Sequence, residues 1–249
     1  MTMATTTKVA LVTGAGSGIG QATALRLGRE GYRLAVVYGR SAAQAAQTTA
    51  AIVAAGGDAK CFALDVTCEQ SVARLFDAVL TTFGRLDVLV NCAGAGHYGK
   101  LKEIEMADFD RLFALNTRGT FMMCRAAARC LQPGGRIINI STGATASNAV
   151  GQSLYVASKA ALEGFSKVLA RELGPQQIAV NVVSPGMTDT PLLAQGNADY
   201  LRQLGAKQAA MGRCGQPGEV ADAIAALVGA DGSWISGQVI RVDGGSVIV

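Results

Sequence analysis

The sequence predicts an α/β protein built on a doubly wound, seven-stranded parallel sheet with helices on both faces. Short apolar runs alternate with helical patterns along the whole chain, and right-handed crossovers turn such alternation into a doubly wound sheet. Charged residues make up only 16% of the chain against a usual share of about 25%, which suits a sheet buried on both faces. No linker divides the 249 residues, so a single domain over residues 1–249 is expected.

Each strand is expected where apolar residues run together, and each helix where they recur at three- and four-residue steps. The expected strands are Val9 to Val12, Arg33 to Tyr38, Ala59 to Leu64, Leu86 to Val90, Arg136 to Ile140, Ile178 to Val183 and Gln238 to Val242. The expected helices run near Gly18 to Glu30, Ala42 to Ala55, Glu69 to Phe83, Ala107 to Leu131, Gln152 to Leu173 and Pro217 to Val228. Residues 1–7 are expected to be disordered.

The alternation is interrupted from Pro185 to Gly215, where Pro191, Gly196 and Gly205 break weak helical signals. This stretch follows the sixth strand, at the carboxyl edge of the sheet, where open α/β sheets bind their ligands. We therefore expect residues 186–215 to form a substrate lid, with a plain surface loop as the alternative.

Charge and cysteine patterns exclude several classes of partner. The net charge of +4 comes from scattered Lys and Arg without a run of like charges, so no nucleic-acid partner is expected. No apolar stretch approaches the ~20 residues of a membrane span and the start lacks an export signal, so we expect no membrane and a cytoplasmic protein. The six cysteines form no C-x-x-C pair and no metal-ligand spacing, which indicates a reducing compartment and no metal site: Cys61, Cys68, Cys92, Cys124, Cys130 and Cys214.

The spacing Tyr-x-x-x-Lys occurs twice, at Tyr98 to Lys102 and at Tyr155 to Lys159. On an α-helix, residues four apart lie on one face, so a lysine ammonium there can favour ionisation of the phenol. Three glycines accompany the first copy between residues 94 and 99, which predicts a turn. The second copy runs on without proline in a helical pattern. Tyr155 and Lys159 are therefore the candidate site.

A glycine-rich turn follows the first strand and opens the first helix, with the sequence Thr13-Gly14-Ala15-Gly16-Ser17-Gly18-Ile19-Gly20. Glycines at such a turn let the backbone bring its N–H groups and the helix N-terminus against a pyrophosphate. Because the strand before and the helix after are both expected, the turn favours a Rossmann-type dinucleotide site over an ordinary strand-to-helix connection.

This turn, Asn91-Cys92-Ala93-Gly94 after the fourth strand, and the Tyr155 to Lys159 pair together resemble the short-chain dehydrogenase/reductase family over nearly the whole chain. Further matches in the same order are Asp65-Val66, Asn116, Asn181-Val182-Val183-Ser184-Pro185-Gly186, and Gly237-Gln238 to Asp243-Gly244-Gly245. The length and the segment Ser233 to Gln238 resemble the 3-oxoacyl-carrier-protein reductase group. The resemblance implies a carbonyl reductase that takes hydride from a nicotinamide nucleotide.

The end of the second strand bears on the choice of nucleotide. Members of the family that prefer NAD carry an Asp there, whereas this chain has Tyr38, followed by Arg40 and Ser41. A cation and a hydroxyl suit the 2′-phosphate of NADP(H), which is therefore the expected cofactor. Ser17 departs from this pattern, because many NADP-dependent relatives have a basic residue at that position, so binding of both nucleotides stays open.

The resemblance assigns catalytic roles to four residues: Tyr155 would protonate the substrate carbonyl oxygen, Lys159 would hold the nicotinamide ribose, and Asn116 would anchor a water that relays protons. The fourth member of the family's set is usually a serine, but here the position falls on Thr142. Threonine keeps the hydroxyl and adds a methyl group that restricts χ1. The neighbouring Ser141 is expected to point elsewhere, since side chains alternate faces along a strand.

The same resemblance places further residues around the nucleotide. Asp65, Val66, Asn91, Ala93 and Gly94 would border the adenine and ribose, and Pro185, Gly186, Thr188 and Thr190 the nicotinamide amide. The only histidine, His97, lies in the loop after the fourth strand and is given no catalytic role.

Four positions bear on whether the substrate is free or attached to acyl carrier protein. Relatives that use the carrier protein present basic residues near the entrance, and the matching positions here, Pro133 and Gln176, are uncharged, with Arg129 and Arg136 close by. We therefore favour a free ketone, β-keto ester or aldehyde over an acyl carrier protein substrate. The expected pocket residues are mostly apolar: Gly96, His97, Val150, Met187, Leu192 and Leu193.

Two other functions stay open: an NAD-dependent alcohol dehydrogenase that works in the oxidative direction, and a non-catalytic module that senses nucleotide. The C-terminal segment Val247-Ile248-Val249 is apolar and, by analogy with tetrameric relatives, is expected to pack in a homotetramer, with a frayed tail as the alternative.

Overall fold

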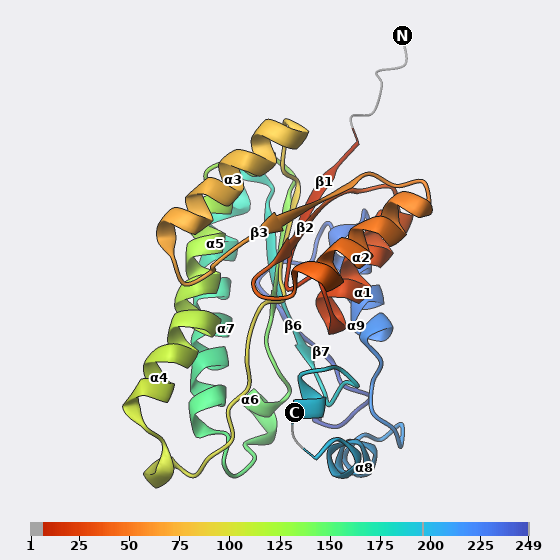
Figure 1. Cartoon of the computed structure of the whole chain (residues 1–249). Coiled ribbons are helices and arrows are strands. Elements are labelled where there is room, and N and C mark those ends of the chain that lie inside the picture. The colour runs from red at the N-terminus through yellow and green to blue at the C-terminus, as the bar shows by residue number, and fades with distance from the viewer. Residues whose placement is uncertain (1–6, 196, 249) are drawn as a thin grey trace.

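A computed structural model describes residues 7–195 and 197–248, so the expected disorder of residues 1–7 falls almost entirely outside the described residues. Seven parallel strands form one sheet in the order β3-β2-β1-β4-β5-β6-β7 (Figure 1), and the predicted fold class is confirmed. The strands are β1 Val9–Thr13, β2 Arg33–Tyr38, β3 Ala59–Ala63, β4 Val88–Asn91, β5 Arg136–Ile140, β6 Ala179–Pro185 and β7 Val239–Val242.

The longer helices connect successive strands, as the alternating pattern predicts. They are α1 Gly18–Arg29, α2 Ala42–Ala54, α3 Glu69–Phe83, α4 Met106–Phe113, α5 Thr120–Ala127, α7 Ser153–Leu173, α8 Ala198–Gln208 and α9 Pro217–Val228, with a short α6 at Ala144–Ser147. Helix α3 ends where Gly84 adopts φ 78°, a left-handed conformation that glycine reaches without strain. Helix α9 begins with Pro217, and the Glu219 carboxylate accepts the Gln216 N–H at 2.7 Å.

The sheet separates two apolar layers because neighbouring residues of each strand face opposite sides. On β1, Val9 and Leu11 pack against the layer of α3, α5 and α7, while Ala10 and Val12 pack against the layer of α1 and α9. Figure 1 shows these two groups of helices on opposite faces of the sheet. The central strands are apolar throughout because both of their faces are covered.

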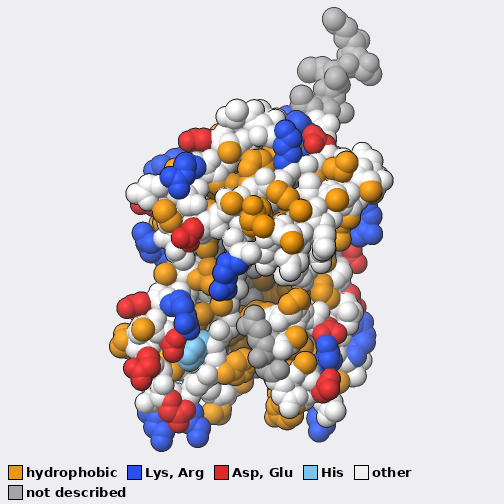
Figure 2. Space-filling view, in the orientation of Figure 1, with side chains coloured by type: hydrophobic (Ala, Val, Ile, Leu, Met, Phe, Trp, Pro, Cys, Tyr) orange, Lys and Arg blue, Asp and Glu red, His pale blue; other side chains and the backbone are white. Residues whose placement is uncertain are grey.

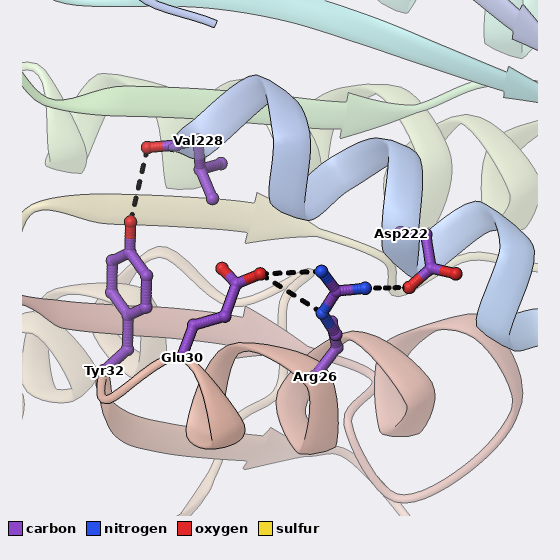
Figure 3. A network of polar contacts seen from close by, with 5 residues as sticks. All are labelled: Arg26, Glu30, Tyr32, Asp222 and Val228. Carbon is purple, nitrogen blue, oxygen red and sulfur yellow. Dashed lines mark hydrogen bonds and ion pairs between the residues drawn. The ribbon is translucent and has the colours of Figure 1, made fainter. Parts of the chain in front are cut away.

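Polar contacts at the periphery join α1 to α9 (Figure 3). Arg26 of α1 pairs with Glu30 at 2.8 Å and with Asp222 of α9, and the Tyr32 hydroxyl donates to the Val228 carbonyl at 3.3 Å. The ion pairs are solvent-exposed and therefore contribute little stability. The two helices are held mainly by the apolar layer beneath them.

The predicted helix from Ala107 to Leu131 is found, but it changes its hydrogen-bonding pattern midway and ends earlier. Helix α4 ends at Phe113, residues Ala114–Gly119 form a π-helical turn, and α5 runs from Thr120 to Ala127. Apolar periodicity cannot distinguish a π turn from an α-helix, because one extra residue shifts the pattern by less than a third of a turn.

The expected irregular stretch of residues 186–215 contains the eleven-residue helix α8. Gly205 lies inside this helix instead of interrupting it. A Cβ at this position would lie 2.5 Å from Cys214 Sγ and 2.9 Å from Met187 Cβ. The glycine therefore allows α8 to pack closely on this segment, a tertiary reason that overrides its low helix propensity.

Candidate active site

The strand order reverses between β1 and β4, and their carboxyl ends meet at the edge of the sheet where open α/β folds bind ligands. The Thr13 hydroxyl ties these ends together, because its Oγ1 accepts the N–H groups of Cys92 at 3.1 Å and Ala93 at 3.0 Å. Figure 2 shows the surface hollowed on this lower side, between the lobe over α4 and the lobe over α8, with hydrophobic side chains around the hollow.

The glycine-rich turn has the geometry of a phosphate cradle. Gly14 and Gly18 adopt φ of 65° and 54°, and a Cβ on Gly20 would lie 2.4 Å from the Gly14 carbonyl oxygen. A Cβ on Gly14 would lie 3.2 Å from the Ala93 nitrogen. The backbone is therefore compressed where α1 begins, with unpaired N–H groups at a helix N-terminus. These residues fit a dinucleotide pyrophosphate.

The neighbours of this turn come from the places that the sequence predicts. A Cβ on Gly18 would lie 3.3 Å from Thr190 Cγ2, and one on Gly16 would lie 3.3 Å from the Ser41 carbonyl oxygen. Arg40 is exposed and forms no ion pair within the described part of the chain. The turn is thus bordered by the segment after β2 on one side and the segment after β6 on the other.

Asp65 after β3 makes a local turn. Its Oδ1 accepts the N–H of Thr67 at 2.9 Å and the hydroxyl of Thr67 at 2.7 Å, and these hydrogen bonds hold the pKa of the Asp65 carboxyl below its usual range. Val66 is buried, and a Cβ on Gly119 of the π turn would lie 3.0 Å from its methyl group. Asn91 is also buried and donates to Asn139 Oδ1 at 2.8 Å.

Beyond β6, Thr188 has its hydroxyl on the Gly186 carbonyl at 3.0 Å, and its backbone pairs with Gly215. The Thr190 hydroxyl accepts the Leu193 N–H at 3.3 Å. Pro185 touches the opposite side of the site, because its carbonyl accepts the Gly143 N–H at 2.7 Å. The segments after β5 and β6 are therefore joined at this edge.

Tyr155 and Lys159 lie one turn apart on α7, with Lys159 only 5% exposed. The Lys159 ammonium donates to the Ile140 carbonyl at 2.7 Å. Burial lowers the pKa of Lys159 to about 8, while Cys92 and Glu163 act in the opposite direction. A lysine in this environment stands close to its titration point at neutral pH.

Burial raises the pKa of the Tyr155 phenol, and a hydrogen bond with Thr142 opposes this shift. That Lys159 favours ionisation of the Tyr155 phenol therefore stays a prediction. In this structure the lysine ammonium donates to the Ile140 carbonyl, and burial is the largest influence on the pKa of the phenol. Sequence spacing brings the two residues to one face but does not determine which effect prevails.

Thr142 lies beside Tyr155, and Ser141 does not. The Ser141 hydroxyl donates to Glu163 Oε1 at 2.5 Å on the buried side of the strand end. The Thr142 hydroxyl lies close enough to the Tyr155 phenol to lower its pKa, and Thr142 Oγ1 accepts the Ala144 N–H at 3.2 Å. Just beyond the end of β5, the two adjacent hydroxyls thus point to different sides, in the predicted way.

Asn116 sits fully buried in the π turn and clamps the loop after β4 against α7. Its Nδ2 donates to the Ala95 carbonyl at 2.9 Å and to the Ser158 hydroxyl at 3.1 Å, and its Oδ1 accepts the Ala95 N–H at 2.9 Å. A Cβ on Gly94 would lie 3.2 Å from Asn116 Oδ1 and 3.4 Å from Lys159 Nζ. Gly94 therefore permits the loop to approach both side chains.

The first Tyr-x-x-x-Lys copy is not helical at Tyr98, which lies in a loop and is 63% exposed. Tyr98 nevertheless lies close enough to Tyr155 to contribute to raising the pKa of its phenol. Beside it, His97 Nε2 lies 3.6 Å from Asp108 Oδ2, and the buried His97 Nδ1 has no hydrogen-bond partner within the described residues. Sequence reasoning placed His97 at this edge but gave no sign of its pairing.

Pro133 and Gln176 lie away from this edge. Pro133 precedes β5 and Gln176 precedes β6, so both are at the amino ends of their strands, opposite the end that carries Thr142. Arg136 starts β5 and donates to the Gly134 carbonyl at 2.6 Å. The expectation that Pro133 and Gln176 border the substrate entrance of their own chain is wrong. It was based on matching positions in relatives and took no account of the end of the sheet at which they lie.

Within the part of the chain that the structure describes, no group of three or more His, Cys, Asp or Glu is placed to hold a metal ion. All six cysteines are free thiols. Among the described helices, none is both long enough and apolar enough to cross a membrane.

Known proteins resemble this chain over nearly its full length. The family model described as enoyl-(acyl carrier protein) reductase matches residues 14–246. The short chain dehydrogenase/reductase nsrJ of Aspergillus novofumigatus is 39% identical, with 96% of this chain and 95% of that protein covered. Tetrahydroxynaphthalene reductase of Pyricularia oryzae is 34% identical, with 96% and 89% covered.

Among solved structures, the angucycline C-6 ketoreductase LanV with bound NADP superposes with a TM-score of 0.92 at 35% identity, covering 97% of this chain and 96% of that one. LanV has also been solved with NADP and rabelomycin, with a TM-score of 0.87 at 36% identity and 96% of both chains covered. A nucleotide cradle, a Tyr-x-x-x-Lys helix at the same sheet edge, and these similarities lead to one conclusion: the chain belongs to the short-chain dehydrogenase/reductase family of oxidoreductases.

Proposed function

We propose that the protein reduces a carbonyl group of a small molecule to an alcohol, with NADPH as the cofactor and Tyr155 as the general acid. The observation that carries this proposal is the Tyr155 phenol, within reach of the Thr142 hydroxyl and one helical turn from the buried Lys159, at the sheet edge that also holds the glycine-rich turn. NADPH, when bound, supplies the hydride.

The side chains have separate tasks in this reaction. Tyr155 gives its proton to the carbonyl oxygen, and the Thr142 hydroxyl donates a hydrogen bond to the same oxygen as negative charge develops. Lys159 holds the nicotinamide ribose and stabilises the phenolate that forms when the proton leaves. Asn116 supports the loop that closes the site, and a proton relay through its bound water remains part of this proposal.

NADP(H) is proposed over NAD(H) because Arg40 and Ser41 follow Tyr38 at the end of β2, where the adenosine ribose would lie. Arg40 is exposed and unpaired within the described residues, so its guanidinium is free to bind a 2′-phosphate. The NADP-bound state of LanV supports this choice. The test is kcat/KM for NADPH and NADH in wild type and Arg40→Ala. We expect the preference for NADPH to fall roughly tenfold to a hundredfold, since charge-assisted hydrogen bonds contribute about 1.5–3 kcal/mol.

The proposed nucleotide site combines the residues inferred from the resemblance. The pyrophosphate would lie on Gly14, Gly16, Ser17, Gly18, Ile19 and Gly20, the adenosine beside Tyr38, Arg40, Ser41, Asp65, Val66, Asn91, Ala93 and Gly94, and the nicotinamide beside Tyr155, Lys159, Pro185, Gly186, Thr188 and Thr190. Thr190 lies close to Gly18, which supports one continuous site from the pyrophosphate turn to the residues near the nicotinamide.

A free ketone is proposed as the substrate class, with an acyl group on carrier protein as the alternative. Relatives with this chain's fold include a reductase of tetrahydroxynaphthalene and a C-6 ketoreductase of angucyclines, which supports a ketone. NADPH oxidation should be followed with a panel of ketones, β-keto esters and aldehydes, and with acetoacetyl-carrier protein beside its small thioester analogue. Faster turnover of the carrier-bound substrate than of every free ketone would favour the alternative.

Two further functions are separated by the same assay. Nucleotide binding without turnover of any carbonyl would favour a sensing module. Faster alcohol oxidation with NAD than ketone reduction with NADPH would favour an alcohol dehydrogenase. We propose against both, because a sensing module has no need of a phenol and a buried lysine at the nucleotide, and because Arg40 suits a phosphate.

Residues 186–215 are proposed to act as the substrate lid, since Thr190 lies close to the nucleotide turn and α8 borders the hollow of Figure 2.

A homotetramer is also proposed. Phe121 and Val168 on neighbouring helices are 50% and 57% exposed, and Ile248 near the C-terminus is 86% exposed, so apolar surface is available for association. Val249 lies outside the described residues. Sedimentation velocity would test the assembly.

A further inference from the structure

Glu163 lies on α7 one turn beyond Lys159 and two turns beyond Tyr155, so all three side chains project from the same side of the helix. Its carboxylate forms hydrogen bonds with other side chains of the protein. Glu163 Oε1 accepts the Ser141 hydroxyl at 2.5 Å and the Thr145 hydroxyl at 2.9 Å. Ser141 directly precedes Thr142 just after β5, and Thr145 lies three residues beyond it in α6.

The same contacts reach Thr142 itself. The Thr145 hydroxyl is also 2.9 Å from the Thr142 carbonyl oxygen, so its proton is shared between that oxygen and Glu163. One carboxylate oxygen thus binds the chain before and after Thr142. Since the Thr142 hydroxyl lies close enough to the Tyr155 phenol to affect its pKa, α7 carries both the phenol and the carboxylate that anchors the segment around Thr142.

Glu163 also brings negative charge close to a buried cation. Among the described residues, no Lys or Arg lies within ion-pair distance of Glu163. Its charge acts on Lys159, four positions earlier, and favours the ammonium against the cost of burial. The other titratable group that acts on Lys159 is Cys92, whose thiol has its pKa raised to about 12 by burial and stays protonated in the assay range.

From these contacts we propose that Glu163 is a positioning residue of the active site, which holds Thr142 against Tyr155 through Ser141 and Thr145 and keeps Lys159 charged. This inference rests on the proposed carbonyl reduction. Glu163 touches neither substrate nor cofactor in this account. A purely structural role would also tie β5 to α7, but it would leave the titration of Lys159 unchanged.

Glu163→Gln separates charge from shape, because the amide oxygen can still accept both hydroxyls while the negative charge is lost. We expect the pKa of Lys159 to fall by roughly half a unit to one unit, as measured by NMR of 13C-labelled lysine with the signal assigned by its absence in Lys159→Met. This readout needs no turnover, so it remains valid if the protein reduces no ketone. Glu172→Gln, an exposed change on the same helix, is the control and should leave the titration unmoved.

Turnover provides the second readout. In Glu163→Gln the loss of activity at high pH should begin roughly half a unit to one unit lower than in wild type, with kcat at pH 6 within about twofold. Glu163→Ala should lower kcat about tenfold already at pH 6, because Thr142 is no longer held, with the same shift at high pH as Glu163→Gln and an unchanged KM for NADPH. The double change Ser141→Ala with Thr145→Val should reproduce the loss in kcat without moving the pH profile.

The outcomes decide the proposal in either direction. A Lys159 titration in Glu163→Gln that superposes on wild type would overturn the electrostatic half. An unchanged kcat in Glu163→Ala, whatever its melting temperature, would overturn the positioning half and leave a structural tether. Absence of wild-type turnover with every carbonyl would count against the proposed function alone, since the NMR titration still reports on Glu163.

Discussion

Tyr98 and Tyr155 stand at the same sequence spacing from a lysine, yet their surroundings are opposite. Tyr98 lies in a loop, 63% exposed, and Lys102 is an exposed residue of the short 3-10 turn Leu101–Glu103. Tyr155 lies on the first turn of α7, and Lys159 is 5% exposed with its ammonium on the Ile140 carbonyl. A Tyr and a Lys four residues apart form a reactive pair only where a helix places both side chains on one face and packing against the sheet shields them from water.

The contrast also shows why burial matters to the chemistry. Charges in water are screened, whereas the buried Lys159 has its pKa lowered to about 8 by desolvation. The cost of burying it is partly offset by the hydrogen bond to the Ile140 carbonyl and by Glu163. Tyr98 lies near enough to Tyr155 to contribute to raising the pKa of its phenol, but no helix aligns it with Lys102.

Replacing each lysine in turn should give the largest difference in activity between the two Tyr-x-x-x-Lys copies. Lys159→Met should lower kcat/KM at least about a hundredfold, because general acid and base groups contribute roughly 10²–10⁴-fold and the cation that supports Tyr155 is lost. Lys102→Met should stay within about twofold of wild type. Steady-state kinetics with NADPH and one reactive ketone measure both. Similar losses in the two variants would mean that the exposed copy also serves the reaction.

The hydroxyl beside Tyr155 gives the next effect. Thr142→Val should lower kcat about a hundredfold, since it removes one donor to the developing oxyanion, while Thr142→Ser should keep most of the activity. Ser141→Ala should have a smaller effect than Thr142→Val, because its hydroxyl faces Glu163. The reverse order of the last two variants would assign the role to Ser141.

Two glycines of the loop after β4 sharpen the contrast further. Gly94→Ala should lower kcat roughly tenfold, because the added Cβ would press on Asn116 Oδ1 at 3.2 Å and Lys159 Nζ at 3.4 Å. Gly96→Ala is the matched control, since nothing lies within 4 Å of its Cβ position, and it should be neutral. Equal activity of both variants would show that the loop does not approach the buried pair so closely.

The remaining expected effect is on stability instead of activity. Because burial lowers the pKa of Lys159 to about 8 from 10.5, the unfolded chain binds more protons between these values, and the free energy of unfolding should rise with pH through that window. Relative to Lys159→Met, wild type should gain on the order of 2–3 kcal/mol between pH 7 and pH 10 in urea titrations, at about 1.4 kcal/mol for each unit. A constant difference would contradict the buried, depressed lysine.

The strands and the main helices could be predicted because their signals are local. Apolar runs place all seven strands within two residues, and the two Tyr-x-x-x-Lys copies are distinguished by glycines next to Tyr98 and a proline-free helix after Tyr155. The glycine-rich turn is equally local, since the positive φ of Gly14 and Gly18 belongs to those residues themselves.

The remaining features depend on tertiary contacts. The π turn at Asn116 follows from an amide that binds both Ala95 and Ser158, and α8 continues through Gly205 because Cys214 and Met187 pack on it. Glu163 carries no motif at all. Its proposed role follows only from the folded structure, in which the Ser141 and Thr145 hydroxyls donate to its carboxylate.

Hydride transfer in Tyr155→Phe, beside Tyr98→Phe, tests the central claim most directly. Stopped-flow absorbance of NADPH in a single turnover separates this step from binding. The account predicts an NADPH affinity within about twofold of wild type in both variants, a rate at least about a hundredfold lower in Tyr155→Phe, and little change in Tyr98→Phe. Equal rates in the two variants would contradict the assignment of Tyr155 as the general acid.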